Sequence, residues 1–198
     1  KKRYAMNVYD NEGTRYQVPQ LKVMGLEIVR SSTPAPVRAS LKEAVRLTLT
    51  TDEKTLQKFI EKTQKEFKSM SPEEIAFPRG CNNIGKYTCD TEIYKKGCPI
   101  HVRGSLLYNH YLDVNNISQK YEKIQEGDKV KFLYLKEPNT MRENCISFNS
   151  KIPAEFNVHR YVDYDVMFQK AFLDPMDTIV KSLGWETEET HTLEDLFS

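Results

Sequence analysis

The residues best suited to chemistry stand together at the first positions of the sequence: Lys1, Lys2, Arg3 and Tyr4. Consecutive cations attract the phosphates of a nucleic acid whatever its base sequence, and an aromatic ring adds a rigid apolar contact. A short basic cluster is also common as solvated surface charge. The tetrapeptide alone leaves both interpretations open, so the elements that follow it must decide between them.

Cysteine and histidine offer the other candidates for chemistry. The cysteines are Cys81, Cys89, Cys98 and Cys145, and they lack the short paired spacing of a zinc site. The histidines are scattered, and the sequence contains no glycine-rich phosphate loop and no nucleophile elbow. A thiol hydrolase that pairs Cys98 or Cys145 with a histidine such as His101 is one alternative. The stronger prediction is a binding element with reduced thiols and no catalytic or metal site of its own.

Composition bounds the class of protein. The chain has 198 residues and a net charge of +1, with 39% hydrophobic and 29% charged residues, which is typical of a globular protein. Basic residues predominate near the N-terminus, whereas the stretch after Trp185 carries only acidic charges. No apolar run approaches the roughly 18 residues that a membrane span needs, so no membrane partner is predicted. Because the sequence starts within a charged motif and without Met, we expect a piece of a longer or split protein.

The elements behind the basic cluster begin with a β-hairpin. Apolar and polar residues alternate from Tyr4, the turn falls at Asp10-Asn11-Glu12-Gly13, and a return strand covers 14–18. A separate extended segment is predicted over 21–29, interrupted at Gly25. The hairpin gives the basic cluster a fixed place at the head of a strand.

Helices follow the hairpin. The first is expected after Ser31-Ser32-Thr33-Pro34, with the hydroxyls as N-cap candidates. The second is expected after Thr51-Asp52-Glu53, antiparallel to the first across a tight turn. Both carry an apolar stripe that we interpret as core. The outer face of the second helix bears lysines that fit either DNA phosphates or a solvated surface: Lys54, Lys58, Lys62, Lys65 and Lys68.

The rest of the sequence mixes short helices with a few strands. Ser71-Pro72-Glu73-Glu74 is a capping box that starts a short helix. Residues 79–100 suit loops around one short helix, and a longer helix follows. A strand over 129–135 is predicted to pair with 144–148 across Pro138. The last helical region is expected in two pieces, the second restarting at Asp174-Pro175 and ending at Gly184. The predicted fold class is α+β, mainly helical.

The ordered set of motifs resembles the family B DNA polymerases of the T-even bacteriophage type. The hairpin and its flanks follow the order found where the palm of these enzymes passes into the thumb. The segments that carry the resemblance cover the whole chain: Lys1-Lys2-Arg3-Tyr4, Gly25-Leu26-Glu27-Ile28-Val29-Arg30, Ser71-Pro72-Glu73-Glu74-Ile75-Ala76-Phe77, Pro99-Ile100-His101-Val102-Arg103-Gly104, Phe168-Gln169-Lys170-Ala171-Phe172 and Leu193-Glu194-Asp195-Leu196-Phe197.

The resemblance implies a duplex-binding role for the N-terminal cluster. In that family a Lys-x-Tyr motif, here Lys2 and Tyr4, contacts the minor groove of primer–template DNA. Minor-groove acceptors occupy similar positions in every Watson–Crick pair, so such a contact is independent of sequence. Phosphate contacts are expected from Lys1, Arg3 and Arg30.

The resemblance also implies a second partner, the sliding clamp, and a division of the chain into three domains. Family members of this phage group end in an apolar peptide that docks on the sliding clamp, here Leu193, Leu196 and Phe197, although Asp195 stands where an aromatic is common. The implied domains are a palm–thumb hairpin over 1–30, a thumb over 31–185 and an acidic tail over 186–198.

The catalytic parts of the family lie outside this sequence. Nucleotidyl transfer uses aspartates that hold divalent metal, Mg²⁺ in the parent polymerase, and these lie in palm motifs upstream of Lys1, as does the proofreading exonuclease. We therefore expect this chain alone to be inactive and to act with upstream palm, fingers and exonuclease, in the cytoplasm of the infected bacterial host. The alternative is a free-standing accessory protein that binds duplex DNA.

Overall fold

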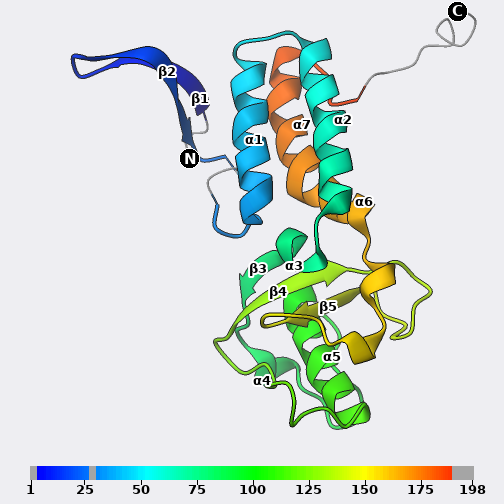
Figure 1. Cartoon of the computed structure of the whole chain (residues 1–198). Helices are drawn as coiled ribbons and strands as arrows, with labels where there is room; N and C mark the ends of the chain where they lie inside the picture. The colour runs from blue at the N-terminus through cyan, green and yellow to red at the C-terminus, as the bar shows by residue number, and fades with distance from the viewer. Residues whose placement is uncertain (1–3, 27–29, 189–198) are drawn as a thin grey trace, which may run out of the picture. The chain divides into compact units, whose positions relative to one another are not determined.

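The computed structural model describes residues 4–26 and 30–188 (Figure 1). By packing, the chain forms two units, which we call the helical unit (Lys1–Ser69 with Phe168–Ser198) and the sheet unit (Met70–Met167). The architecture is α+β and mainly helical, with an N-terminal β-hairpin and a small second sheet, which confirms the predicted fold class. The functional boundaries expected at residues 30 and 185 stay predictions.

The N-terminal hairpin consists of β1 (Tyr4–Asn11) and β2 (Thr14–Met24), paired antiparallel from Tyr4 opposite Met24 to Asn11 opposite Thr14. The turn residues Glu12 and Gly13 have φ of 51° and 88°, the positive values that a two-residue hairpin turn with the twist of its strands requires. The predicted turn is therefore confirmed, and it is tighter than expected.

β2 is one continuous strand, so the predicted break between a return strand and a second extended segment was wrong. The register of the pair shifts between Val8 and Asp10, where β2 holds extra residues that include Pro19. Proline has no N–H for a ladder hydrogen bond, and a bulge is where a strand tolerates it. The sequence signal taken as a break thus marks a bulge.

Three helices build the core of the helical unit: α1 (Ala35–Thr48), α2 (Glu53–Ser69) and α7 (Asp174–Val180), which lie side by side in Figure 1. The predicted stripe of α1 is buried throughout: Val37, Leu41, Ala44, Val45 and Thr48. Asp52 caps α2, accepting the Thr55 N–H at 2.8 Å, as predicted. The hydroxyl N-cap expected for α1 was wrong, because Pro34 occupies that position and the Thr33 N–H turns back to the Arg30 carbonyl at 3.2 Å.

The last helical region is continuous. α6 (Tyr164–Phe168) passes through a π-helical turn (Gln169–Leu173) into α7, which a 3₁₀ turn (Lys181–Leu183) extends. The predicted restart at Asp174-Pro175 corresponds to the first turn of α7, but helical backbone runs into it directly from the π-helical turn, so the expected division into two pieces was wrong. Gly184 ends the region with φ 74°, as the predicted C-cap.

The sheet unit packs one helix on a three-stranded antiparallel sheet, in the order β3 (Phe77–Gly80), β4 (Lys129–Tyr134) and β5 (Cys145–Phe148). The pairing of β4 with β5 confirms the prediction, whereas β3 was not predicted, and its last two residues were expected within the loops of 79–100. As an edge strand, β3 accommodates Pro78. α5 (Ile100–Val114) lies against β5 so closely that a Cβ on Gly104 would stand 2.5 Å from the Ser147 Oγ.

Two short helices complete this unit. α3 (Pro72–Ile75) carries the predicted capping box, in which the Ser71 N–H donates to the Glu74 carboxylate at 2.8 Å. α4 (Ile84–Tyr87) is the short helix expected among the loops of 79–100. Its first amides, from Asn83 and Ile84, donate to the Glu126 carboxylate at 2.6 and 2.8 Å.

Candidate nucleic-acid interface

Tyr4 is the predicted contact residue that the structure places most clearly. It is half-buried at the open end of the hairpin, cross-strand from Met24. Its side of the hairpin and the helical ends of the same unit line a pocket of about 360 Å³. The pocket is mostly apolar, and its lining residues are Tyr4, Ala5, Leu26, Val45, Thr48, Leu49, Thr178, Ile179, Ser182 and Leu183. This pocket was not predicted from the sequence, because its lining residues come from both ends of the chain.

The remaining predicted DNA contacts divide between described and undescribed residues. Lys1, Lys2 and Arg3 lie outside the described residues. Arg30 is exposed, and its carbonyl closes the turn that leads into α1. The structure therefore gives surroundings for Tyr4 and Arg30 only, and it places both in the helical unit.

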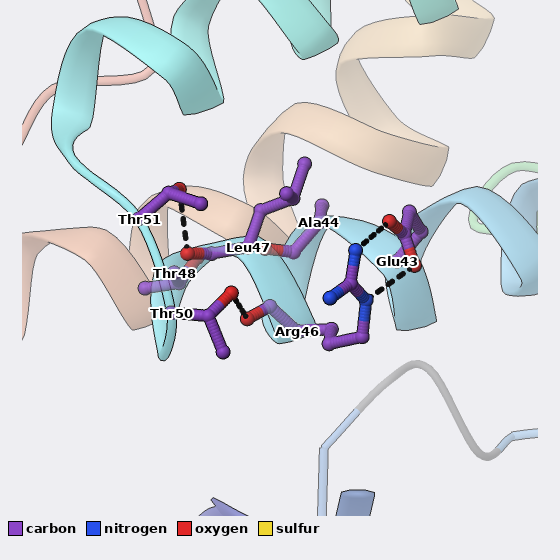
Figure 2. Close-up of polar contacts among 7 residues, drawn as sticks. All are labelled: Glu43, Ala44, Arg46, Leu47, Thr48, Thr50 and Thr51. Atoms are coloured by element: carbon purple, nitrogen blue, oxygen red, sulfur yellow. Dashed lines mark hydrogen bonds and ion pairs between the residues drawn. The ribbon is translucent and has the colours of Figure 1, made fainter. Parts of the chain in front are cut away.

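Not every cation of this unit adds to a positive surface. At the C-terminal end of α1, Arg46 forms a fork with Glu43, with Nε at 2.9 Å and Nη2 at 2.5 Å from the two carboxylate oxygens (Figure 2). The hydrogen bonds from Arg46 hold the pKa of Glu43 below its usual range. On the hairpin, Arg15 lies 3.7 Å from Asp10. Each arginine thus has a carboxylate beside it that offsets part of its charge, more closely for Arg46 than for Arg15.

The turn between α1 and α2 is closed by hydroxyl groups. Thr50 and Thr51 each donate to a carbonyl of the last turn of α1, those of Arg46 and Leu47, at 2.8 Å (Figure 2). These bonds satisfy carbonyls that a helix C-terminus otherwise leaves to water. The antiparallel pairing of α1 and α2 was predicted, but this second use of threonine was not.

The lysines of α2 are exposed as predicted: Lys54, Lys58, Lys62, Lys65 and Lys68. Lys62 lies 3.7 Å from Glu66 one turn later. Exposure is expected both of a surface that meets phosphate and of one that meets water, so a DNA contact by these lysines stays a prediction.

The acidic tail begins on a fixed path. Gln57 of α2 donates from its side-chain amide to the carbonyls of Glu186 and Glu188 at 3.1 and 3.2 Å. Thr187 is buried and donates to Asp177 at 2.7 Å. The predicted clamp-binding residues Leu193, Leu196 and Phe197 lie outside the described residues.

Burial keeps the two candidate thiols, Cys98 and Cys145, protonated. Burial raises the pKa of Cys98 to about 11 and also raises that of Cys145, which keeps both protonated at neutral pH. Burial lowers the pKa of His101. A thiol without a thiolate fraction is a poor nucleophile, so the thiol-hydrolase alternative has no support here.

The described residues contain no group of three His, Cys, Asp or Glu side chains placed to hold a metal ion. The Mg²⁺ implied for the parent polymerase therefore has no fitting ligand set in this part of the chain, and no chemical step is assigned to it here. No helix within 4–26 and 30–188 is both long and apolar enough to cross a membrane.

Comparison with known proteins agrees with the motifs. The chain is 35% identical over 201 aligned residues to the DNA-directed DNA polymerase of Enterobacteria phage T4, and 37% identical over 201 to that of Escherichia phage RB69. Each alignment covers 100% of this chain but 22% of the relative, so the chain spans about a fifth of the curated relatives it matches. No family model matches the chain. The resemblance to one region of T-even-type phage DNA polymerases is confirmed.

Proposed function

We propose that this chain is the thumb, with the palm–thumb hairpin, of a family B DNA-directed DNA polymerase, and that it grips primer–template duplex and tethers the enzyme to a sliding clamp. The observation that carries the proposal is the collinear similarity of the whole chain to two polymerases of that name, at 35% and 37% identity. Similarity over the full length argues for a shared structural part and against a borrowed motif.

The grip on DNA is assigned to Lys2 and Tyr4, with Lys1, Arg3 and Arg30 on phosphates. Tyr4 supports this assignment, because it has a defined position in the helical unit, cross-strand from Met24 and beside an apolar pocket. A lysine donor meets acceptors at similar minor-groove positions in all Watson–Crick pairs. Phosphate contacts then add affinity that falls as salt rises.

The tether is assigned to Leu193, Leu196 and Phe197, which fill an apolar pocket of the clamp. Apolar side chains in a pocket supply much of the free energy of such small interfaces. The residues between Glu188 and Leu193 are all polar, which suits a linker.

The polymerase as a whole works in the cytoplasm of the infected host. The upstream palm, fingers and exonuclease complete it, and divalent metal in the palm supports nucleotidyl transfer to the bound nucleotide. This chain supplies affinity and position, and no bond-making group.

Duplex binding tests the grip. In the complete polymerase, Lys2→Ala and Tyr4→Ala are each expected to weaken primer–template binding by about tenfold, since one good groove contact contributes about 1–3 kcal/mol. The loss should be similar for different base sequences. Lys151→Ala, an exposed lysine of the sheet unit, serves as the charge-matched control and should change little. A loss confined to one base sequence would overturn the assignment.

Tail deletion tests the tether. Removing residues 193–198 should shorten extension products when clamp is loaded, while single-turnover insertion without clamp stays unchanged. If insertion itself collapses, the tail supports the fold and is not a tether.

A further inference from the structure

A second pocket belongs to the sheet unit alone. Its volume is about 500 Å³, within the range of pockets that hold small ligands. Its walls come from the loop that joins β4 to β5 and from two 3₁₀ turns between β5 and α6, which are η2 (Ala154–Phe156) and η3 (His159–Tyr161) (Figure 1). We call it the basic pocket, and its lining residues are Thr140, Ala154, Asn157, His159 and Arg160.

The loop that forms one wall of the basic pocket is closed by a buried asparagine. Asn139 donates from its side-chain amide to the carbonyls of Lys136 and Glu143 at 2.8 and 2.7 Å. The Thr140 hydroxyl then donates to the Phe156 carbonyl at 3.2 Å, which joins this loop to η2. Satisfied hydrogen bonds of this kind fix the loop and its connection to the other wall.

The other wall is anchored by buried side chains that stand between the lining residues. Phe156 and Val158 are both buried. The Phe156 ring packs edge-on against the rings of Tyr108 and Tyr111 of α5, with centroids 5.7 and 6.1 Å away. Asn157, between the two buried residues, is exposed and has φ of 54°, a conformation that asparagine adopts more readily than most residues. Both walls are therefore positioned by the core of the sheet unit, and the pocket is preformed.

The polar groups of the basic pocket are donors that the fold leaves available. The guanidinium carbon of Arg160 lies 4.8 Å from the centroid of the Tyr161 ring, a stacking contact that orients the guanidinium and leaves its N–H groups available. Within the described part of the chain, no hydrogen bond or ion pair occupies the side chain of His159 or that of Arg160. The Asn157 amide makes one contact, at 3.5 Å to the Glu155 carbonyl, which is at the limit of a hydrogen bond.

The charge of the basic pocket is positive. Among the described residues that line it, Arg160 is a permanent cation and none carries a carboxylate. The carboxylate of Glu155, in η2, accepts from Lys120 at 2.6 Å and from the Tyr121 hydroxyl at 3.3 Å. Glu137, on the loop, is exposed and is outside the lining. A guanidinium, an imidazole and an amide in one pocket suit a phosphate, whose oxygens accept several hydrogen bonds and whose charge the guanidinium offsets.

We propose that the basic pocket binds a terminal phosphate, either that of a free nucleotide or the 5′-phosphate of a DNA strand. A terminal phosphate carries a charge of about −1.5 to −2 at pH 7, whereas an internal phosphodiester carries a single negative charge. A concave site of this volume admits a phosphate with one substituent, while an internal phosphodiester has a sugar on each side. The site is separate from the proposed grip and tether and does not depend on either.

Titration of the full chain with pyrophosphate and with dAMP, followed by calorimetry, tests the site. Both probes should bind saturably, and Arg160→Gln should weaken each by about tenfold or more, because hydrogen bonds to a charged group are lost. Lys129→Gln is the charge-matched control, at an exposed position of β4 outside the lining, and should leave both affinities unchanged. Absence of saturable binding below about 10 mM would overturn the proposal, as would equal affinities in Arg160→Gln and the unaltered chain.

Filling the pocket provides a second test that does not depend on the fold tolerating Arg160→Gln. Ala154 is an exposed lining residue, so Ala154→Glu places a carboxylate in the pocket and should abolish binding of both probes. Ala154→Gln takes up nearly the same space without charge and should weaken binding less. Denaturant midpoints equal to that of the unaltered chain show that each variant is folded. Unchanged affinity in folded Ala154→Glu would contradict the site.

Single-stranded oligonucleotides with a 5′-phosphate or a 5′-hydroxyl distinguish the two sources. If the ligand is a DNA end, the phosphorylated strand binds more tightly and Arg160→Gln removes the difference. If it is a free nucleotide, the two strands bind alike with or without Arg160→Gln, while dAMP keeps its dependence on Arg160. Equal weakening of both strands by Arg160→Gln would mean that internal phosphodiesters occupy the pocket, and would overturn the terminal-phosphate assignment.

Discussion

The hairpin and the sheet unit both contain antiparallel β-sheet, but they differ in the exposure of their apolar side chains. The hairpin exposes Met6, Tyr9, Val18 and Met24, with Val18 78% exposed. The sheet unit buries its large side chains, and Phe148 and Ile146 of β5 are 0% exposed. The sheet has α5 to cover it, whereas the hairpin lacks a core of its own. A two-stranded ribbon alone is marginally stable in water.

From this difference we expect substitutions in the sheet unit to change folding stability, and substitutions on the exposed face of the hairpin to change binding to a partner. The sheet unit has a closed core, so a poor fit there costs folding free energy. The exposed side chains of the hairpin contribute little to the free energy of folding. Exposed apolar side chains are typical of an interface, which agrees with the proposed junction with the rest of a polymerase.

The largest effect is expected where α5 meets β5. In Gly104→Val the new side chain collides with Ser147, whose backbone N would lie 2.7 Å from the Cβ. Overpacking of this kind costs about 3 kcal/mol, measured as a lower denaturant midpoint at unchanged slope. Gly85→Ala is the control, because nothing lies within 4 Å of its Cβ. Unchanged stability of Gly104→Val would mean that the close approach is absent.

A smaller, pH-dependent effect is expected from His101 on the same helix. Burial, assisted by the charge of Arg79, lowers its pKa in the folded protein. The unfolded state therefore binds the proton more readily, at its ordinary pKa of about 6.5. Stability is full above that pH and falls as the pH drops from there to the lowered folded pKa.

Denaturation at a series of pH values checks this prediction. His101→Gln should flatten the dependence between pH 6.5 and the folded pKa of His101, since it removes the titrating ring. The control is His110→Gln, at an exposed position of α5, which should leave the dependence in place. An unchanged slope in His101→Gln would contradict the assignment.

The smallest effect on stability is expected in the hairpin. Val18→Thr keeps the β-branched shape at an exposed site and should change the free energy of unfolding by less than about 0.5 kcal/mol. The same change is expected to weaken association with the separately produced upstream part of the polymerase, measured by titration. A stability loss comparable to that of Gly104→Val would break the contrast between the two β structures.

Helices and caps that depend on residues close together in the sequence were predicted correctly. The stripes of α1 and α2, the Ser71 capping box and the Gly184 cap all follow from spacing and cap chemistry. Two of the errors depend on a partner strand, whereas the N-cap of α1 was mistaken for a local reason, since Pro34 occupies that position. Pro19 sits in a bulge that only the opposite strand reveals, and β3 needs β4 to be a strand at all.

Residues of the candidate site were predicted from the sequence, but their surroundings in the fold were not. The sequence singled out Tyr4 and Arg30, but it gave no sign of the pocket beside Tyr4, because α7 contributes to it from the other end of the chain. Gln57 was missed for the same reason. Its acceptors are 129 and 131 positions away, and a polar residue beside an apolar helical stripe normally predicts no partner.

The central claim, that this chain is the duplex-binding part of a polymerase, is tested most directly by reconstitution. The upstream part, with palm, fingers and exonuclease, is assayed for primer–template affinity and primer extension alone and with this chain added. The account predicts affinity at least about tenfold weaker without the chain, and recovery of affinity and extension when it is added. Equal affinity and extension by the upstream part alone would contradict it.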